Sequence, residues 1–176
     1  SRSPEESVRF FRIQAPGQTL SLATSLLETA NLVAAREPDV AATLRARGRA
    51  YLDGFFAAPH DLAKSVFVIL SRRDDNTVVE AMPIWGSRYG LWPASYVALT
   101  CLCAFRFTRD PRLLAWAEAV GGAYQSAPFP ADTAVPAMDA GLGLGLLVDL
   151  YDLTGEKRWR DAGLALAPLL VAAYLD

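Results

Sequence analysis

The stretch GLGLGLLVDLYDLTGEKRWRDAGLALAPLL, residues 141–170, decides the fold. The chain is apolar almost all round from Asp139 to Leu153, where Thr154-Gly155-Glu156 interrupts the pattern. From Lys157 to Leu175 apolar residues return at the spacing of one helix face. Because a helix that is apolar on every side must be enclosed by others, this stretch predicts a hairpin of one inner and one outer helix.

A hairpin of the same kind is predicted just before it. An apolar helix runs from Pro93 to about Phe107, and an amphipathic helix runs from Arg112 to Gln125. The segment between them, Thr108-Arg109-Asp110-Pro111, returns 46 residues later as Thr154-Gly155-Glu156-Lys157. This weak internal repeat predicts two layers, with the apolar helices inside and the amphipathic helices outside.

The first half of the chain predicts a third helical hairpin and a small β-hairpin. Helical spacing covers Thr19–Ala57 and is interrupted at Arg36-Glu37-Pro38-Asp39, where Pro38 suits a helix start. Ser65–Ser71 and Thr77–Ala81 are short β-branched runs on either side of the turn residues Asp74-Asp75-Asn76. The predicted fold is therefore all-α, an (α/α) helical-hairpin array with one β-hairpin insertion.

Length and composition agree with one folded domain over residues 1–176. The chain has 176 residues, of which 52% are hydrophobic and 20% charged, and this excludes a disordered protein. A net charge of -2 supplies no basic field for nucleic-acid phosphates. The longest apolar runs are shorter than the roughly 18–20 residues of a membrane-spanning helix. We therefore expect neither a nucleic acid nor a membrane as partner.

The quoted stretch resembles the helical hairpins of the six-hairpin glycosidase-like (α/α) toroid superfamily. There an inner helix ending in an LxDLYxLTGD-like sequence leads into an outer helix whose first turn carries a basic and an aromatic residue. The matching positions here are Leu150, Tyr151, Leu153, Thr154, Gly155, Arg158 and Trp159. The resemblance covers about Leu91–Asp176 well and Thr19–Ala57 loosely. Since three hairpins are counted, the chain is expected to be part of a toroid or a smaller open array.

This resemblance implies a carbohydrate-active protein that acts on an oligo- or polysaccharide. Members of the superfamily include glycoside hydrolases, polysaccharide lyases and sugar epimerases, and glycoside hydrolysis is the leading expectation. A lyase or epimerase is the first alternative, and a non-catalytic helical binding or assembly module is the second. Because half a toroid covers its inner helices poorly, self-association or a missing second half is also expected.

Paired carboxylates are the first candidates for catalysis, since glycoside hydrolysis commonly uses two of them. In the resembling enzymes the site lies at the N-terminal ends of inner helices, and Asp139 stands at such an end. Asp is also a preferred N-cap residue, which is the alternative role for Asp139. Glu80, at the end of the second predicted strand, is the second catalytic candidate, with a solvated strand position as its alternative. Asp132, on the loop before Asp139, is a candidate for substrate binding.

The loop PIWGSRYGLWP, residues 83–93, supplies the other substrate-binding candidates. Trp85, Tyr89 and Trp92 offer rings that stack on the apolar faces of sugars, and Tyr89 is the suspected base in a lyase or epimerase. Arg88 offers a bidentate partner for the carboxylate of an acidic sugar. The alternative is that these aromatic rings fill the core between helices.

No metal and no cofactor are expected. His60 is the only histidine and is expected to cap a helix end or to lie in solvent. Cys101 and Cys103 point roughly 200° apart on a helix, so they do not complete a zinc site with usual ligands. The GLGLG sequence at 141–145 departs from GxGxxG because residue 146 is Leu, and a nucleotide is not expected either.

Overall fold

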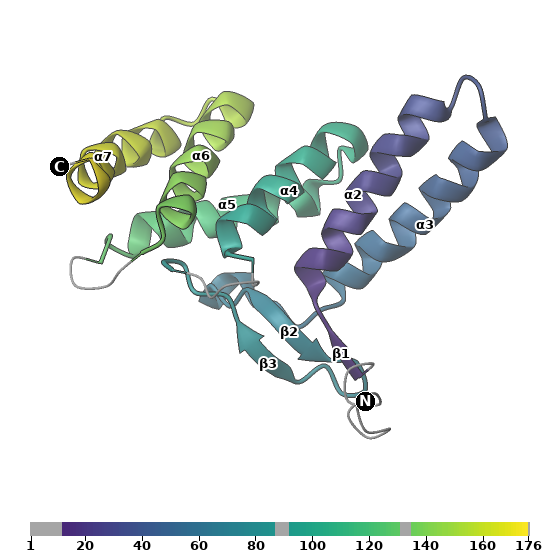
Figure 1. Ribbon diagram of the computed structural model, residues 1–176, viewed down its shortest axis with the longest axis horizontal. Coiled ribbons are helices and arrows are strands. Elements are labelled where there is room, and N and C mark those ends of the chain that lie inside the picture. Colours follow the sequence, from purple (N-terminus) through teal and green to yellow (C-terminus); the bar gives the residue numbers. More distant parts are fainter. Residues whose placement is uncertain (1–11, 87–91, 131–134, 176) are drawn as a thin grey trace. The chain divides into compact units, whose positions relative to one another are not determined.

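The computed structural model describes residues 12–86, 92–130 and 135–175 (Figure 1). Its described part is mostly helical, with one small sheet, as predicted. The chain forms two compact units. The first unit holds the chain up to Asp61 together with Val66–Met82, and the second holds Leu62–Ser65 together with the chain from Pro83 onward.

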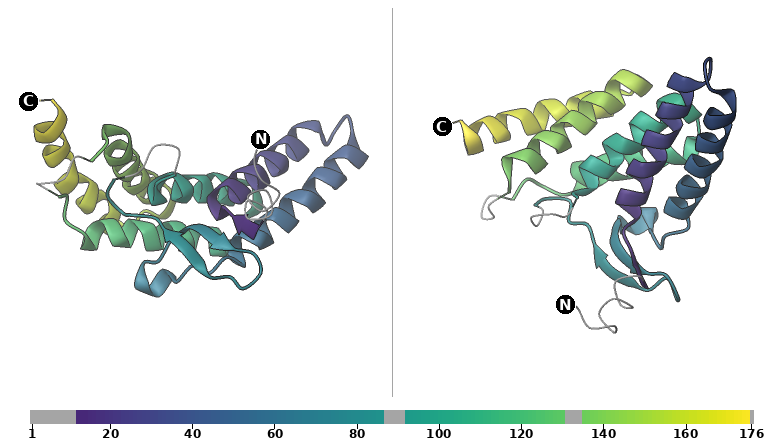
Figure 2. Two further views of the ribbon diagram at one scale, coloured as in Figure 1. Left: turned by 60° about the horizontal axis from the view of Figure 1, so that its bottom comes forward. Right: turned by 45° about the vertical axis from the view of Figure 1, so that its right-hand side comes forward.

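Two helices of the first unit form the hairpin predicted for Thr19–Ala57. Helices α2 (Pro16–Val33) and α3 (Pro38–Phe56) lie side by side along their lengths (Figures 1 and 2). Each begins at a proline, whose missing N–H and fixed φ suit the first helical position. The two backbones approach closely at Gly48, where a Cβ would lie 2.8 Å from Leu27 Cγ.

The β-hairpin of the first unit is also present, within a three-stranded antiparallel sheet. Its strands β1 (Ile13–Gln14), β2 (Val68–Arg72) and β3 (Val78–Ala81) follow the order β1-β2-β3. The sequence prediction missed β1 because two residues carry no periodicity. Tertiary contacts hold β1, including a 2.9 Å hydrogen bond that the Gln14 side chain donates to Ser71 Oγ.

The second unit contains the two hairpins that share the internal repeat. Helices α4 (Ala94–Thr108) and α5 (Pro111–Ser126) form one, and α6 (Ala137–Thr154) and α7 (Lys157–Tyr174) form the other. Helix α6 packs against both α4 and α5 (Figure 1), and the short 3-10 helix η1 (Leu62–Lys64) packs on α5. The helix boundaries lie within two residues of those predicted.

The turns that close α4 and α6 have the same structure. Thr108 Oγ1 donates to the Ala104 carbonyl and accepts from the N–H of Asp110. Thr154 Oγ1 repeats this pattern with Leu150 and Glu156. Both helices end at a residue with left-handed backbone, which is the residue after the threonine in each case. These matching hydrogen bonds confirm the internal repeat.

Helix α6 differs from the prediction in one respect, since it is not enclosed on every side. It buries one face, and Met138 and Val148 on the remainder are 61% and 49% exposed. Among the described helices α4, α5 and α7 pack on α6, and they leave this part of its surface open. Helix α6 therefore has more apolar surface than the other described helices cover.

None of the helices in the described ranges has both the length and the hydropathy needed to cross a bilayer.

Candidate functional site

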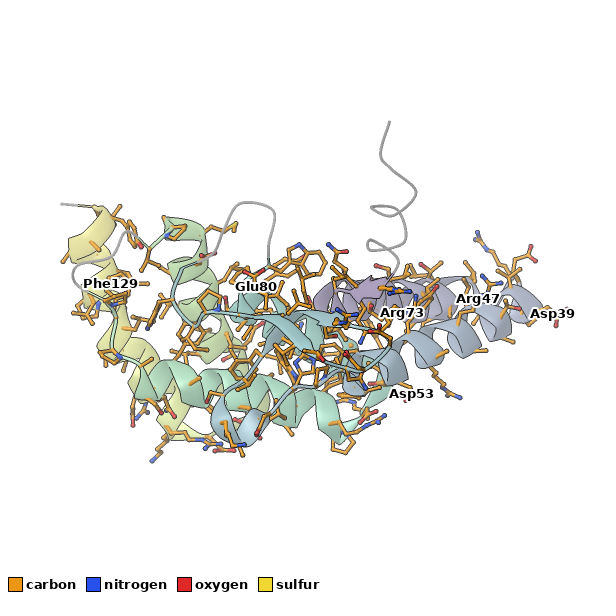
Figure 3. The ribbon with its side chains drawn as sticks, turned by 90° about the horizontal axis from the view of Figure 1, so that it is seen from below. Asp39, Arg47, Asp53, Arg73, Glu80 and Phe129 are labelled. Atoms are coloured by element: carbon orange, nitrogen blue, oxygen red, sulfur yellow. The ribbon has the colours of Figure 1, made fainter. Side chains whose placement is uncertain are left out.

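A cavity of about 380 Å³ lies in the second unit, beside the C-terminal part of α5. One wall comes from Trp85 and the segment that follows α5, and the opposite wall comes from α6 and α7. Figure 3 shows Phe129, which lines the cavity, beside α7. The lining residues are Trp85, Tyr124, Gln125, Ala127, Pro128, Phe129, Leu147, Arg158, Asp161, Ala162, Ala165, Leu166 and Leu169.

Three aromatic rings form the wall that contains Trp85. The Trp85 ring stands edge-on to Tyr124 at 4.7 Å between centroids and to Phe129 at 5.1 Å. Its indole N–H donates a 3.0 Å hydrogen bond to the carbonyl of Ala127, so the only polar atom of the side chain is satisfied. Edge-to-face contacts and this hydrogen bond fix the Trp85 ring in one orientation.

The polar part of the lining is held by contacts within the same unit. Gln125 Nε2 donates a 3.0 Å hydrogen bond to the carbonyl of Arg158. The Arg158 guanidinium lies 4.1 Å from the Trp159 ring centroid, and its Nε lies 2.7 Å from a carboxylate oxygen of Glu156. These contacts hold an amide and a guanidinium in the lining, which also includes the carboxylate of Asp161.

Tyr124 connects the cavity to a buried cluster of polar side chains. Its ring packs against Gly143, where a Cβ would lie 3.1 Å from Tyr124 Cζ and 3.5 Å from Oη. Asp139 lies one turn before Gly143 on the same face of α6, and Ser95 lies in the first turn of α4. Asp139 and Ser95 are 0% exposed and Tyr124 is 6% exposed. Within the described part of the chain their side-chain oxygens have no hydrogen-bond partner.

The electrostatics agree with this arrangement. Burial raises the pKa of Tyr124 to about 12, and the nearby Asp139 carboxylate raises it further, while the Ser95 hydroxyl opposes both effects. Ser95 and Tyr124 therefore lie close to each other in the second unit. Tyr124 is a protonated phenol at neutral pH, so its O–H is available as a donor.

Asp139 is not the N-cap of α6, so the capping role weighed for it is wrong. The N-cap is Pro136, and the backbone N–H of Asp139 already donates a 2.9 Å helical hydrogen bond to the Pro136 carbonyl. Asp139 is the third residue of the helix, where a negative charge is favoured by the helix dipole. Its burial, which the sequence did not indicate, distinguishes it from the solvated acids of the chain.

The remaining candidates are distributed over the molecule. Glu80 lies on β3 in the first unit (Figure 3), so its pairing with Asp139 stays a prediction. Trp92 packs on Tyr96 at 4.7 Å between centroids and is not among the described residues that line the cavity. Trp85 does line it, as the prediction requires of a substrate-binding ring. Three further candidates lie outside the described residues: Arg88, Tyr89 and Asp132.

Tyr124 and Ser95 were not predicted from the sequence. Tyr124 continues the inward stripe formed by Ala117 and Val120, so helical spacing places it inside. The Tyr124 hydroxyl, on an otherwise apolar face of the helix, is the feature by which the sequence could have identified this residue. Ser95 had no comparable signal, because its burial depends on the packing of α4 in the second unit.

No group of three or more histidine, cysteine or acidic side chains suited to a metal ion occurs in the described ranges.

Comparisons of the chain with protein-family models, with curated proteins and with solved structures found no match.

Proposed function

We propose that this is a carbohydrate-active protein of the glycoside hydrolase type, with its saccharide bound in the cavity beside Trp85. The observation that carries the proposal is the aromatic wall of Trp85, Tyr124 and Phe129, with Gln125 and Arg158 at its rim. Sugar rings have apolar C–H faces and hydroxyl edges, and they need both kinds of partner. A volume of about 380 Å³ lies in the usual range of small-molecule sites.

Asp139 is fully buried and does not line the cavity, so it is proposed as a positioning residue behind Tyr124 and not as a group that contacts the saccharide. It lies in the first turn of α6, and Tyr124 separates it from the cavity. Glycoside hydrolysis commonly uses two carboxylates, and Glu80 on β3 of the first unit stays the second carboxylate that the sequence predicts. In this proposal the rings of Trp85 and Tyr124 support the apolar face of the sugar.

The test combines binding and turnover. Wild type, Trp85→Ala, Asp139→Asn and Glu80→Gln are assayed on a glycan array and for release of reducing ends from the glycans that bind. We expect Trp85→Ala to abolish binding, and each carboxylate variant to retain binding but lose hydrolysis. Trp92→Ala is the matched control, because this ring packs on Tyr96 instead of lining the cavity. If wild type binds no glycan, the proposal is wrong.

The exposed face of α6 and α7 favours a second candidate function, a non-catalytic assembly module. An apolar groove of about 280 Å³ lies between Leu144, Val148 and Leu164 on this face. Leu164 is 66% exposed and lines the groove, so the face offers both a projecting side chain and a recess. The proposed occupant is a second copy of this chain, because a two-fold axis would bring the projecting Leu164 of each copy to the recess of the other.

Sedimentation velocity tests this second function. We expect wild type to form dimers with increasing concentration and Leu164→Glu to remain monomeric. Leu32→Glu changes a leucine of the first unit that is 78% exposed, and it should behave as wild type. A monomeric wild type at all concentrations would rule out the assembly function. Glycan binding without turnover by the carboxylate-intact protein would favour a binding module over a hydrolase.

A further inference from the structure

The open face of the α6–α7 hairpin is the repeat equivalent of a face that is covered. The offset of 46 residues relates Leu102 to Val148 and Gly121 to Ala167. Leu102 is 1% exposed, and Gly121 packs beneath side chains of α6 and α7. Val148 is 49% exposed, and Ala167 lines the open groove. Because the equivalent face of α4–α5 receives a helical hairpin, a helical hairpin is the kind of partner that the open face fits.

The side chains that project from the open face are more apolar than those of the covered face. On α5, Glu118 lies 3.9 Å from Arg158, and Gln125 donates a hydrogen bond to the Arg158 carbonyl, so both reach the following hairpin. One repeat later the same positions hold Leu164 and Val171, which are 66% and 50% exposed. A partner that covers them removes apolar surface from water, which stabilises the complex.

Helix α7, which lies at one side of the second unit (Figure 1), carries these apolar side chains on a stripe that begins with basic residues. The stripe follows the spacing of one helix face through Lys157, Arg160, Leu164, Val171 and Leu175. Leu175, at the far end of the stripe, is 78% exposed. The stripe is therefore basic where the helix begins and apolar where the helix ends.

This charge distribution opposes the dipole of α7 itself. The helix has no acidic residue in its first turn and no basic residue in its last turn. A helix is partially positive at its amino end, so Lys157 stands where a cation is disfavoured. The last carbonyl groups lack partners within the helix and favour a cation near them. An antiparallel second α7 would bring each Lys157 to the last turn of the other helix, where its charge is favoured.

We infer that the partner on this face is the α6–α7 hairpin of a second copy, with the two α7 helices antiparallel about a two-fold axis near Ala167. The inference rests on the second proposed function, the assembly module, and adds the orientation of its partner. In this arrangement Leu164 of each copy lies against Val171 of the partner subunit, and each basic amino end meets the carboxyl end of the other helix. A parallel arrangement would place the two basic ends together.

Sedimentation velocity of Lys157→Glu tests the charge complementarity. The substitution reverses a charge twice in each dimer, so we expect the dissociation constant of the dimer to rise about tenfold or more. Glutamate in the first turn favours α7 itself, which separates weaker dimerisation from a loss of structure. Arg47→Glu, at an exposed arginine of α3 (Figure 3), is the matched control and should dimerise as wild type.

Cross-linking tests the orientation. Leu164→Cys and Val171→Cys are mixed in equal amounts and treated with a short bismaleimide, and mass spectrometry identifies the linked positions. We expect links between position 164 of one copy and position 171 of the other, and few between identical positions. Wild type treated in the same way gives the background from Cys101 and Cys103.

The outcomes separate this inference from the function on which it rests. A wild type that stays monomeric would overturn both. Dimers that Leu164→Glu abolishes but Lys157→Glu leaves unchanged would overturn the antiparallel arrangement and leave the assembly function standing. Dimers that link only between identical positions, or show no link between copies, would overturn the arrangement in the same way.

Discussion

Gly121 lies where three helices of the second unit meet. A Cβ on this residue would lie 2.6 Å from Leu150 Cδ1 on α6 and 2.8 Å from Trp159 Cζ3 on α7. Leu150 and Trp159 are both 0% exposed, so neither side chain has free space into which to move. The absence of a side chain at Gly121 is thus what allows α5 to contact α6 and α7 closely.

Gly121→Ala is expected to destabilise the protein by about 1–3 kcal/mol, because an added methyl group overpacks a filled core. Gly122→Ala is the matched control, since a Cβ there meets nothing within 4 Å. The free energy of unfolding of Gly122→Ala should rise by up to about 1 kcal/mol, because alanine has the better helix propensity. Urea unfolding of both variants measures the difference, and equal stabilities would contradict the described contact of α5 with α6 and α7.

His60 is half-buried and bonds the Phe55 backbone in the last turn of α3, so it lies at a helix end as predicted and the solvated alternative is wrong. Its Nδ1 accepts a 3.0 Å hydrogen bond from the N–H of Val68 on β2, and its ring lies 5.1 Å from the Phe55 ring. Burial lowers the pKa of His60 to about 4, although a hydrogen bond with the Phe55 backbone opposes the effect. The neutral imidazole is therefore part of the folded first unit.

This lowered pKa predicts a loss of stability in acid. Above pH 6.5 the imidazole is neutral in both the folded and unfolded states and contributes nothing to pH dependence. As the pH falls from 6.5 to about 4 only the unfolded state takes up the proton, which costs about 3 kcal/mol of folding free energy.

Urea unfolding at pH 7, 5.5 and 4 measures this loss, with His60→Asn as the comparison. Asparagine retains an acceptor for the Val68 N–H but does not titrate between these pH values. We expect the free energy of unfolding of the variant to fall less steeply with acid than that of wild type. Parallel pH profiles for the two proteins would refute the assignment to His60.

At the scale of elements, the two repeated turns differ at the residue with left-handed backbone. Arg109 has φ 57° and Gly155 has φ 71° at equivalent positions after α4 and α6. A side chain in this conformation is strained, and glycine is not. The α6–α7 turn is therefore free of a strain that the α4–α5 turn retains.

Gly155→Ala should destabilise the protein by about 1 kcal/mol, and Arg109→Gly should stabilise it by a similar or smaller amount. Gly141→Ala serves as control, because this residue lies inside α6 and a Cβ there meets nothing within 4 Å. That variant should be stabilised by helix propensity. The melting temperatures of the three variants measure these changes in stability. A lower melting temperature for Arg109→Gly would contradict the strain assigned to Arg109.

At the scale of the whole molecule, the two compact units can be followed separately in solution. The chain has four tryptophans, and all belong to the second unit: Trp85, Trp92, Trp116 and Trp159. Tryptophan fluorescence therefore reports the second unit, while far-UV circular dichroism reports the helices of both. Coincident unfolding transitions by the two probes are the mark of one cooperative domain.

Gly48→Ala tests the single-domain prediction with these probes. Its Cβ would lie 2.8 Å from Leu27 Cγ and 3.3 Å from the Ala23 carbonyl, so the first unit is destabilised by about 1–3 kcal/mol. If residues 1–176 fold as one domain, the fluorescence transition shifts together with the dichroism transition. A fluorescence transition that stays in place would show that the units unfold separately. Gly54→Ala, whose Cβ lies 3.8 Å from Thr19 Cγ2, is the control.

Much of the fold was predictable because its signals are local. Helical spacing and the breaks at Pro38, Pro111 and Gly155 placed six helices, and the turn residues around Asp75 placed the β-hairpin. The candidate site was less predictable. Trp85 was identified from the composition of its loop, but Tyr124 was missed because its role depends on which residues of α6 face it.

By itself the amino-acid sequence determined where helices begin and end and which hairpins repeat, since capping, propensity and periodicity act over a few residues. Only the tertiary structure decided that Asp139 is buried beside Tyr124 and Ser95, and that Trp85 and Phe129 face one cavity. These groups are far apart in the chain, and only packing specific to this molecule brings them together. The physical reason is that burial and charge pairing are properties of neighbours in space, which no local pattern in the sequence records.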